Sequence, residues 1–162
     1  VQAAALLDDR FQLRIVGRGP RLEVVKELAE GLPPGRVVFG DLVEPELAAR
    51  YLRASDATLV PLAPRPELAK FVPSKLFDCC AVGRPVILAA AGEARQLADA
   101  AGAVRAVPPG DAEALARAVR ELRDDPAAAD RLGERGTSFA AEHLRERQIE
   151  RLEQVLRDAV RD

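Results

Sequence analysis

The segment from Phe71 to Asp78, FVPSKLFD, carries the side chains best placed to do chemistry. Pro73 suits a helix start because it has no N–H to leave unpaired, and Ser74 can cap the helix. The free N–H groups of a first helical turn attract an anion, and the Lys75 ammonium lies beside them. Asp78 follows one turn later on the same face, where its carboxylate can accept hydrogen bonds from two vicinal hydroxyls. The segment predicts a site for a diphosphate and a ribose; the alternative is an ordinary capped surface helix.

A second candidate is the turn Gly17-Arg18-Gly19-Pro20, which follows an apolar run and precedes a helical one. Glycines in this context let the backbone approach a phosphate closely, although a plain tight turn has the same composition. A dinucleotide fingerprint would place a third glycine at position 22, which is Leu22. A nicotinamide site is therefore excluded, and the sequence has no Walker A pattern either.

The remaining candidates are weaker. Gly40 ends an apolar run, and Gly92-Glu93 opens a helical one, where Glu93 could contact a sugar hydroxyl or simply oppose the helix dipole. His143, the single histidine, has no neighbour with which to form a base or metal site. Cys79 and Cys80 are adjacent, which suits reduced core residues rather than a disulfide or zinc ligands. We expect no metal site.

The pattern of apolar residues predicts the strands and helices that position these candidate residues. Strand-length apolar runs each precede a stretch of helical period, and they occupy residues 11–17, 36–39, 57–62, 85–90 and 103–107. Asp111 is a good N-cap for the helix after the last run. A further helix opens at Pro126 with an expected interruption near Gly133 and Gly136, and an amphipathic helix covers 143–160. Strict alternation predicts an α/β fold with a Rossmann-like, doubly wound parallel sheet, whose ligands bind beyond the carboxyl ends of its strands.

The length and net charge of the chain exclude several classes of protein. The 162 residues suit one domain, and 24 Lys and Arg against 26 Asp and Glu give a net charge of −2. No basic field would attract nucleic acid. No apolar run is long enough to span a membrane, and no secretory signal opens the chain. We expect a cytoplasmic protein.

Taken together, the motifs resemble a known family. Val16 to Pro20, Val38-Phe39-Gly40, the segment 72–78, then Ala81 to Ile87, Gly92-Glu93 and Val107 to Asp111 follow the order found in GT-B glycosyltransferases of the large retaining, GT4-like group. The resemblance covers about Phe11 to Leu122. It implies that residues 1–162 are a single donor-binding domain, the C-terminal half of a two-domain enzyme. The implied activity is transfer of a hexose from a UDP- or GDP-sugar to an acceptor hydroxyl.

The resemblance also implies roles for individual residues. Asp78 stands where the family has a glutamate that holds the ribose hydroxyls. Ser74 and Lys75, with the amides after Pro73, stand at the diphosphate, so Lys75 would stabilise the leaving group. Gly17, Arg18 and Gly19 would lie near the phosphates, the loop after Gly40 near the base, and Gly92 and Glu93 near the sugar. The family needs no cofactor or metal, and a separate N-terminal domain binds the acceptor and is where contact with a membrane surface would occur.

Three departures qualify these expectations. Lys70 stands where many members have a second acidic residue, and Asp78 is one methylene shorter than glutamate. The first strand of the family's domain, with its basic loop, has no counterpart, because Val1 to Leu7 match the helix after it. That strand would lie between those at 13–16 and 57–60, so we expect the natural chain to extend upstream and this portion to bind donor with little turnover. The alternatives are a nucleotide-sugar 2-epimerase and a non-catalytic binding module.

Overall fold

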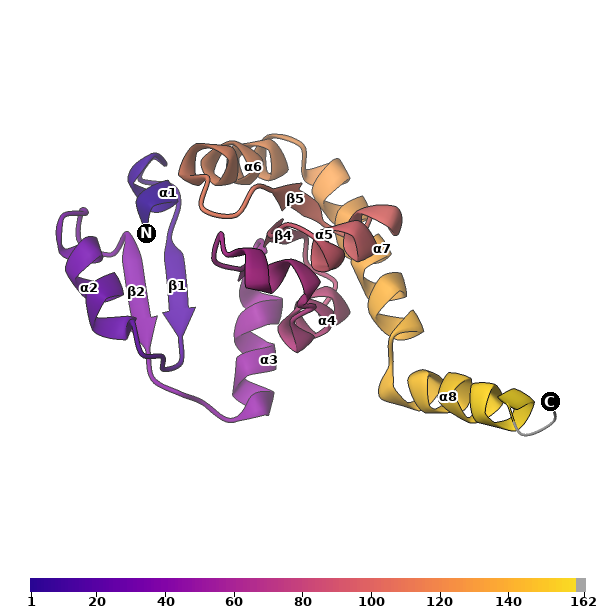
Figure 1. The fold of residues 1–162 in the computed structure, drawn as a ribbon. Coiled ribbons are helices and arrows are strands. Elements are labelled where there is room, and N and C mark those ends of the chain that lie inside the picture. Colours follow the sequence, from indigo (N-terminus) through magenta and orange to yellow (C-terminus); the bar gives the residue numbers. More distant parts are fainter. Residues whose placement is uncertain (160–162) are drawn as a thin grey trace.

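The computed structural model describes residues 1–159 and shows five strands and eight α-helices within that range (Figure 1). The strands are β1 (Leu13–Val16), β2 (Val37–Gly40), β3 (Thr58–Pro61), β4 (Val86–Ala89) and β5 (Arg105–Val107). The helices are α1 (Gln2–Ala5), α2 (Leu22–Glu30), α3 (Pro45–Ala54), α4 (Ser74–Ala81), α5 (Glu93–Ala100), α6 (Ala112–Asp124), α7 (Pro126–Glu142) and α8 (Arg145–Ala159). A short 3-10 helix, η1 (Pro66–Lys70), lies between β3 and α4. The predicted alternation of strands and helices is confirmed.

All strand pairs are parallel, but the strands form two sheets rather than one. β1 pairs with β2, and β4 lies between β3 and β5. In Figure 1 the β1–β2 pair stands beside the three-stranded sheet, with β1 rather than β2 on the side of that sheet. The α/β class is thus confirmed, and β1 does not pair with β3.

The apolar core belongs to the three-stranded sheet, because all four residues of β4 are buried. Val86 and Leu88 face one cluster, which includes buried side chains of α4, α5 and α7. Ile87 and Ala89 face a second cluster formed with α6. Helices therefore cover both faces of this sheet, as the doubly wound pattern requires. By contrast, β1, β2, α2 and α3 contain no buried residue.

The helix that opens at Pro126 is continuous, so the expected interruption near Gly133 and Gly136 was wrong. Both glycines are buried where α7 packs against the end of α4. A Cβ at position 133 would lie 2.3 Å from the Gly83 carbonyl oxygen, and one at 136 would lie 3.6 Å from the Cα of Cys80. These glycines allow two segments to approach closely, which is a packing role rather than a break in the helix.

β1 and β3 each have one unpaired edge within residues 1–159, as do β2 and β5 at the other ends of the two sheets. Leu13 and Gly17 donate their N–H groups toward β2, to Arg36 and Gly40. Thr58 and Leu62 donate toward β4. Because N–H directions alternate along a strand, the amides of Arg14, Val16 and Leu59 point to the other edges. Backbone groups at such edges need a partner strand or water.

This geometry predicts an alternating pattern of amide exchange. The N–H groups of Arg14, Val16 and Leu59 should exchange more than about tenfold faster than those of Ile15 and Val60, because only the latter have ladder partners that must open first. Residue-resolved hydrogen exchange by NMR measures this directly. Equal protection along β1 and β3 would show that both edges are covered within the chain itself.

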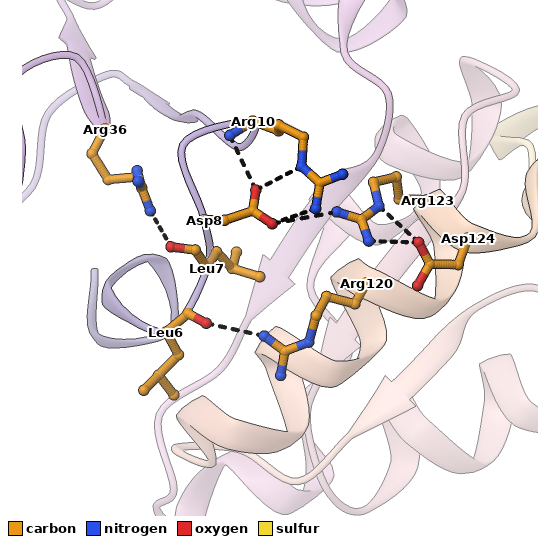
Figure 2. Close-up of polar contacts among 8 residues, drawn as sticks. All are labelled: Leu6, Leu7, Asp8, Arg10, Arg36, Arg120, Arg123 and Asp124. Atoms are coloured by element: carbon orange, nitrogen blue, oxygen red, sulfur yellow. Dashed lines mark hydrogen bonds and ion pairs between the residues drawn. The ribbon is translucent and has the colours of Figure 1, made fainter.

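The N-terminal segment connects the two sheets (Figure 2). The buried Arg36, just before β2, donates to the carbonyl oxygens of Ala4, at 3.0 Å, and Leu7. From the other side, Arg120 of α6 donates to the Leu6 carbonyl at 3.0 Å. Asp8, whose pKa is lowered to about 2 chiefly by its hydrogen bond from Arg10, lies 3.6 Å from Arg123 of α6. The segment is thus anchored to the first sheet through Arg36 and to the second through α6.

Cys79 and Cys80 are free and buried, as expected. Burial raises the pKa of both thiols, that of Cys80 to about 12. At pH 8 we therefore expect neither thiol of the folded protein to react with a disulfide reagent, and both to react after denaturation, because the thiolate is the nucleophile. A thiol count by absorbance checks this. Rapid reaction of the folded protein would mean that α4 opens readily.

No helix within residues 1–159 is long and apolar enough to cross a membrane.

Candidate functional site

The start of α4 is the best-defined candidate site. Pro73 occupies the N-cap position with φ −73°, and no side chain caps the helix. Leu76 donates to the Pro73 carbonyl at 3.0 Å, which is the first turn closing on itself. The expectation that Ser74 caps the helix was wrong, because Ser74 is already the first helical residue. The N–H groups of Ser74 and Lys75 precede the helical hydrogen-bond ladder, so they remain available to an anion.

The outer face of α4 holds the polar candidates. Ser74, Lys75 and Asp78 are exposed, whereas Leu76, Cys79 and Cys80 on the opposite side are buried. Neither Lys75 nor Asp78 has an ion-pair partner among the described residues. The buried face fixes the helix, and this leaves an ammonium and a carboxylate oriented outward one turn apart.

Gly92 holds a neighbouring loop in place. Its φ of +68° and ψ of −142° suit only glycine. A Cβ here would lie 2.0 Å from the Ala69 carbonyl oxygen, so η1 rests directly on the first residues of α5. The segments that contain Lys70 and Glu93 are therefore adjacent, and both side chains are exposed.

The loop that contains Gly110, after β5, contacts the loop that follows β3. A Cβ at Gly110, which has φ +81°, would lie 3.2 Å from the Pro64 ring. The loops that follow β3, β4 and β5 thus meet at the carboxyl ends of their strands, where parallel sheets bind ligands. Nothing in the local pattern of Pro64 or Gly110 indicated this contact. An open hollow of about 510 Å³ lies along residues 63–68, beside these loops rather than at the start of α4.

The glycine turn of the first sheet forms a separate group. Gly17 has φ +122°, a conformation that other residues rarely adopt, and its N–H donates to the Gly40 carbonyl at 3.1 Å. Gly19 has an ordinary φ and open space around it. The exposed Arg18 lies between them. The structure brings Gly17 and Gly40 together, but no hydrogen bond or ion pair among the described residues joins this group to α4 or α5.

His143 lies outside the candidate site. Its ring lies 4.5 Å from the Phe139 ring and 5.2 Å from the Phe77 ring, measured between centroids. Its Nδ1 lies 2.8 Å from the Phe139 carbonyl oxygen, which makes Nδ1 the donor. The ring therefore packs at the end of α7. Within residues 1–159, no group of three or more potential metal ligands converges.

Two aspartates cap the N-termini of helices through side-chain hydrogen bonds. Asp111 accepts from the Ala114 N–H at 2.8 Å, which confirms the predicted cap of α6. Asp125 caps α7 in the same way, by accepting from Ala128 at 2.9 Å. The Asp-Pro pair at 125–126 carried that second signal in the sequence.

A family model described as "Glycosyl transferases group 1" matches residues 1–125. No curated protein shows significant similarity to the chain.

Solved structures with the same fold include Anabaena Alr3699/HepE in complex with UDP, which is 20% identical with a TM-score of 0.75. That match covers 96% of this chain and 43% of that one. Sucrose-phosphate synthase from Thermosynechococcus elongatus is 29% identical with a TM-score of 0.69, over 91% of this chain and 39% of that one. The catalytic domain of cholesterol-alpha-glucosyltransferase from Helicobacter pylori is 17% identical with a TM-score of 0.69, over 88% of this chain and 87% of that one. The chain thus spans less than half the length of the first two proteins.

Proposed function

Because the chain belongs to the group 1 glycosyl transferase family, we propose that it is the nucleotide-sugar-binding half of a retaining glycosyltransferase. The whole enzyme would move a hexose from a nucleoside diphosphate-sugar to an acceptor hydroxyl. The observation that carries the proposal is the start of α4, where uncapped N–H groups, Lys75 and Asp78 share one exposed face. The solved complexes of HepE with UDP and with UDP-glucose make uridine nucleotides the first probes to use.

In this reaction the protein orients the donor and stabilises charge on the leaving diphosphate. The amides of Ser74 and Lys75 and the Lys75 ammonium would stabilise that charge by donating hydrogen bonds to the diphosphate oxygens. Asp78 would accept hydrogen bonds from the ribose hydroxyls and so set the direction of the nucleotide. We propose that Gly17 to Gly19 contact the phosphates, that the loop after Gly40 contacts the base, and that Gly92 and Glu93 contact the sugar. No metal or cofactor has a role in this proposal.

The acceptor would bind to an N-terminal half outside these residues. Two observations support this. The chain covers only 43% of HepE, and β1 and β3 each have one edge without a partner within residues 1–159. A parallel strand from the same polypeptide would satisfy the edge amides of Arg14, Val16 and Leu59. Its carboxyl-end loop would then lie beside Gly17, where a basic residue could meet the diphosphate.

We expect UDP or GDP to stabilise the folded protein and NAD to leave it unchanged. A ligand at 100 times its dissociation constant adds about 2.7 kcal/mol to the free energy of unfolding, which is large enough to appear as a shift in melting temperature. A thermal-shift series with UDP, GDP, ADP, dTDP and NAD makes the measurement. Equal shifts with NAD and UDP, or none with any nucleotide, would contradict the proposal.

Activity of the whole protein separates the alternatives. A glycosyltransferase forms a glycoside only when acceptor is present, whereas an epimerase converts the donor without one. If UDP binds but neither product forms with any acceptor tested, a binding module becomes the better explanation.

A further inference from the structure

The chain that leads into α4 exposes a cation and an aromatic ring in succession. η1 ends at Lys70, and the chain then runs extended to the start of α4, with φ −97° and ψ 125° at Phe71. Val72 packs against the core, whereas Phe71 is 49% exposed and Lys70 is exposed as well. Lys70 forms no ion pair with any of residues 1–159. An apolar ring and an uncompensated positive charge therefore lie just before the candidate donor site.

The order of groups in a nucleoside diphosphate-sugar fixes the end of α4 that the sugar approaches. The proposed function places the ribose at Asp78 and the diphosphate at the amides of Ser74 and Lys75, one turn nearer the helix start. The sugar is bonded to the outer phosphate, so it continues in the same direction, beyond the helix start and toward Lys70. Four extended residues span at most about 14 Å, which a phosphate, a hexose ring and a lysine side chain can fill. Lys70 and Phe71 are thus on the sugar side of the diphosphate.

Three other charged side chains lie around this end of the site. Glu67 is one 3-10 turn before Lys70, so the two share a face of η1. Glu93 follows Gly92, on which η1 rests. Arg65 lines the open hollow beside η1. No ion pair within residues 1–159 involves any of these four charged side chains. The carboxylates can accept hydrogen bonds from sugar hydroxyls, and the cations can bind a negative group.

We propose that the sugar of the donor carries a carboxylate, as a hexuronic acid does, and that Lys70 binds this carboxylate while Phe71 packs against the apolar face of the sugar ring. The inference rests on the proposed function and names the class of its donor. A neutral hexose would leave the Lys70 ammonium without an opposite charge on a surface that the sugar has partly removed from water. A hexuronic acid supplies that charge in place of the primary alcohol of the hexose.

Isothermal titration calorimetry of the full-length protein tests this with UDP, UDP-glucose and UDP-glucuronate, which share one nucleotide. The native protein should bind UDP-glucuronate at least about fivefold more tightly than UDP-glucose, as expected for an ion pair at a partly exposed site. Lys70→Gln should abolish this preference and Lys70→Glu should reverse it, while the affinity for UDP changes less than about twofold. If the thermal-shift series shows GDP to be the tighter nucleotide, GDP, GDP-mannose and GDP-mannuronate replace these probes.

Two variants serve as controls. Phe71→Ala should weaken the binding of both UDP-sugars by about fivefold relative to UDP, because the ring would contact either sugar, and it should keep the ratio between them. Lys26→Gln removes a lysine on α2 that pairs with Glu23, and it should change none of these affinities. A melting curve of each variant without nucleotide checks that it is folded.

Three results would overturn the proposal. The first is equal or weaker binding of UDP-glucuronate than of UDP-glucose by the native protein. The second is a preference that survives Lys70→Gln. The third is a Lys70→Gln variant that binds UDP as poorly as it binds UDP-glucuronate, which would place Lys70 at the diphosphate. If UDP binds and the preference is absent, only this inference fails. If neither UDP nor GDP binds, the proposed function fails and this inference fails with it.

Discussion

Replacing Gly92 by alanine is expected to lower the free energy of unfolding by about 4 kcal/mol. A non-glycine residue held at φ +68° and ψ −142° costs about 1–3 kcal/mol in backbone strain. The new Cβ would also lie 2.0 Å from the Ala69 carbonyl oxygen, and overpacking of this kind costs about 1–3 kcal/mol. Because the obstructing atom belongs to the backbone, η1 must move away from α5 as a unit.

Urea unfolding measures this change as a fall in the midpoint with an unchanged slope. Gly19→Ala is the matched control. Gly19 lies in the turn at residues 17–19 and has an ordinary φ, and a Cβ added there would have no atom within 4 Å. This variant should change stability by less than about 0.5 kcal/mol. If the two variants unfold at the same urea concentration, η1 does not rest on Gly92 in solution.

The second large effect concerns binding rather than stability. Asp78→Ala should weaken UDP binding by about 3 kcal/mol, or more than 100-fold. The variant removes a carboxylate that would accept hydrogen bonds from two ribose hydroxyls, each worth about 1.5–3 kcal/mol. The fold should be unaffected, since Asp78 is exposed and has no ion-pair partner among the described residues. Isothermal titration calorimetry gives the affinity, and a melting curve without nucleotide gives the stability.

Two comparisons make this result specific. Asp130→Ala removes another exposed helical aspartate, on α7, and should leave UDP affinity unchanged. Lys75→Ala should weaken the binding of UDP far more than that of uridine, because only Lys75 would contact the phosphates. Asp78→Ala should weaken the binding of both. If Asp78→Ala leaves the affinity for UDP unchanged, Asp78 does not bind the ribose and α4 is an ordinary surface helix.

The sequence alone was sufficient for the features that depend on local spacing. Strand positions follow from short continuous apolar runs and helix positions from an apolar period of about 3.6 residues, and the structure places each strand within one or two residues of the predicted run. The amphipathic character of α4 also follows from spacing, since Ser74, Lys75 and Asp78 fall opposite Leu76 and Cys80. The cap at Asp111 is a local hydrogen bond between residues three apart. The assignment to the glycosyltransferase family came from the order of such motifs along the chain.

Tertiary structure decided everything that depends on which distant backbones meet. The contact of Ala69 with Gly92, that of Pro64 with Gly110 and that of Gly83 with Gly133 each join segments far apart in sequence. Glycine spacing cannot reveal such contacts, because a glycine required by a close approach is the same residue as one that breaks a helix; this is why α7 was wrongly expected to be interrupted. The projection of α8 is likewise global, since it depends on whether a helix face finds a partner among the other elements.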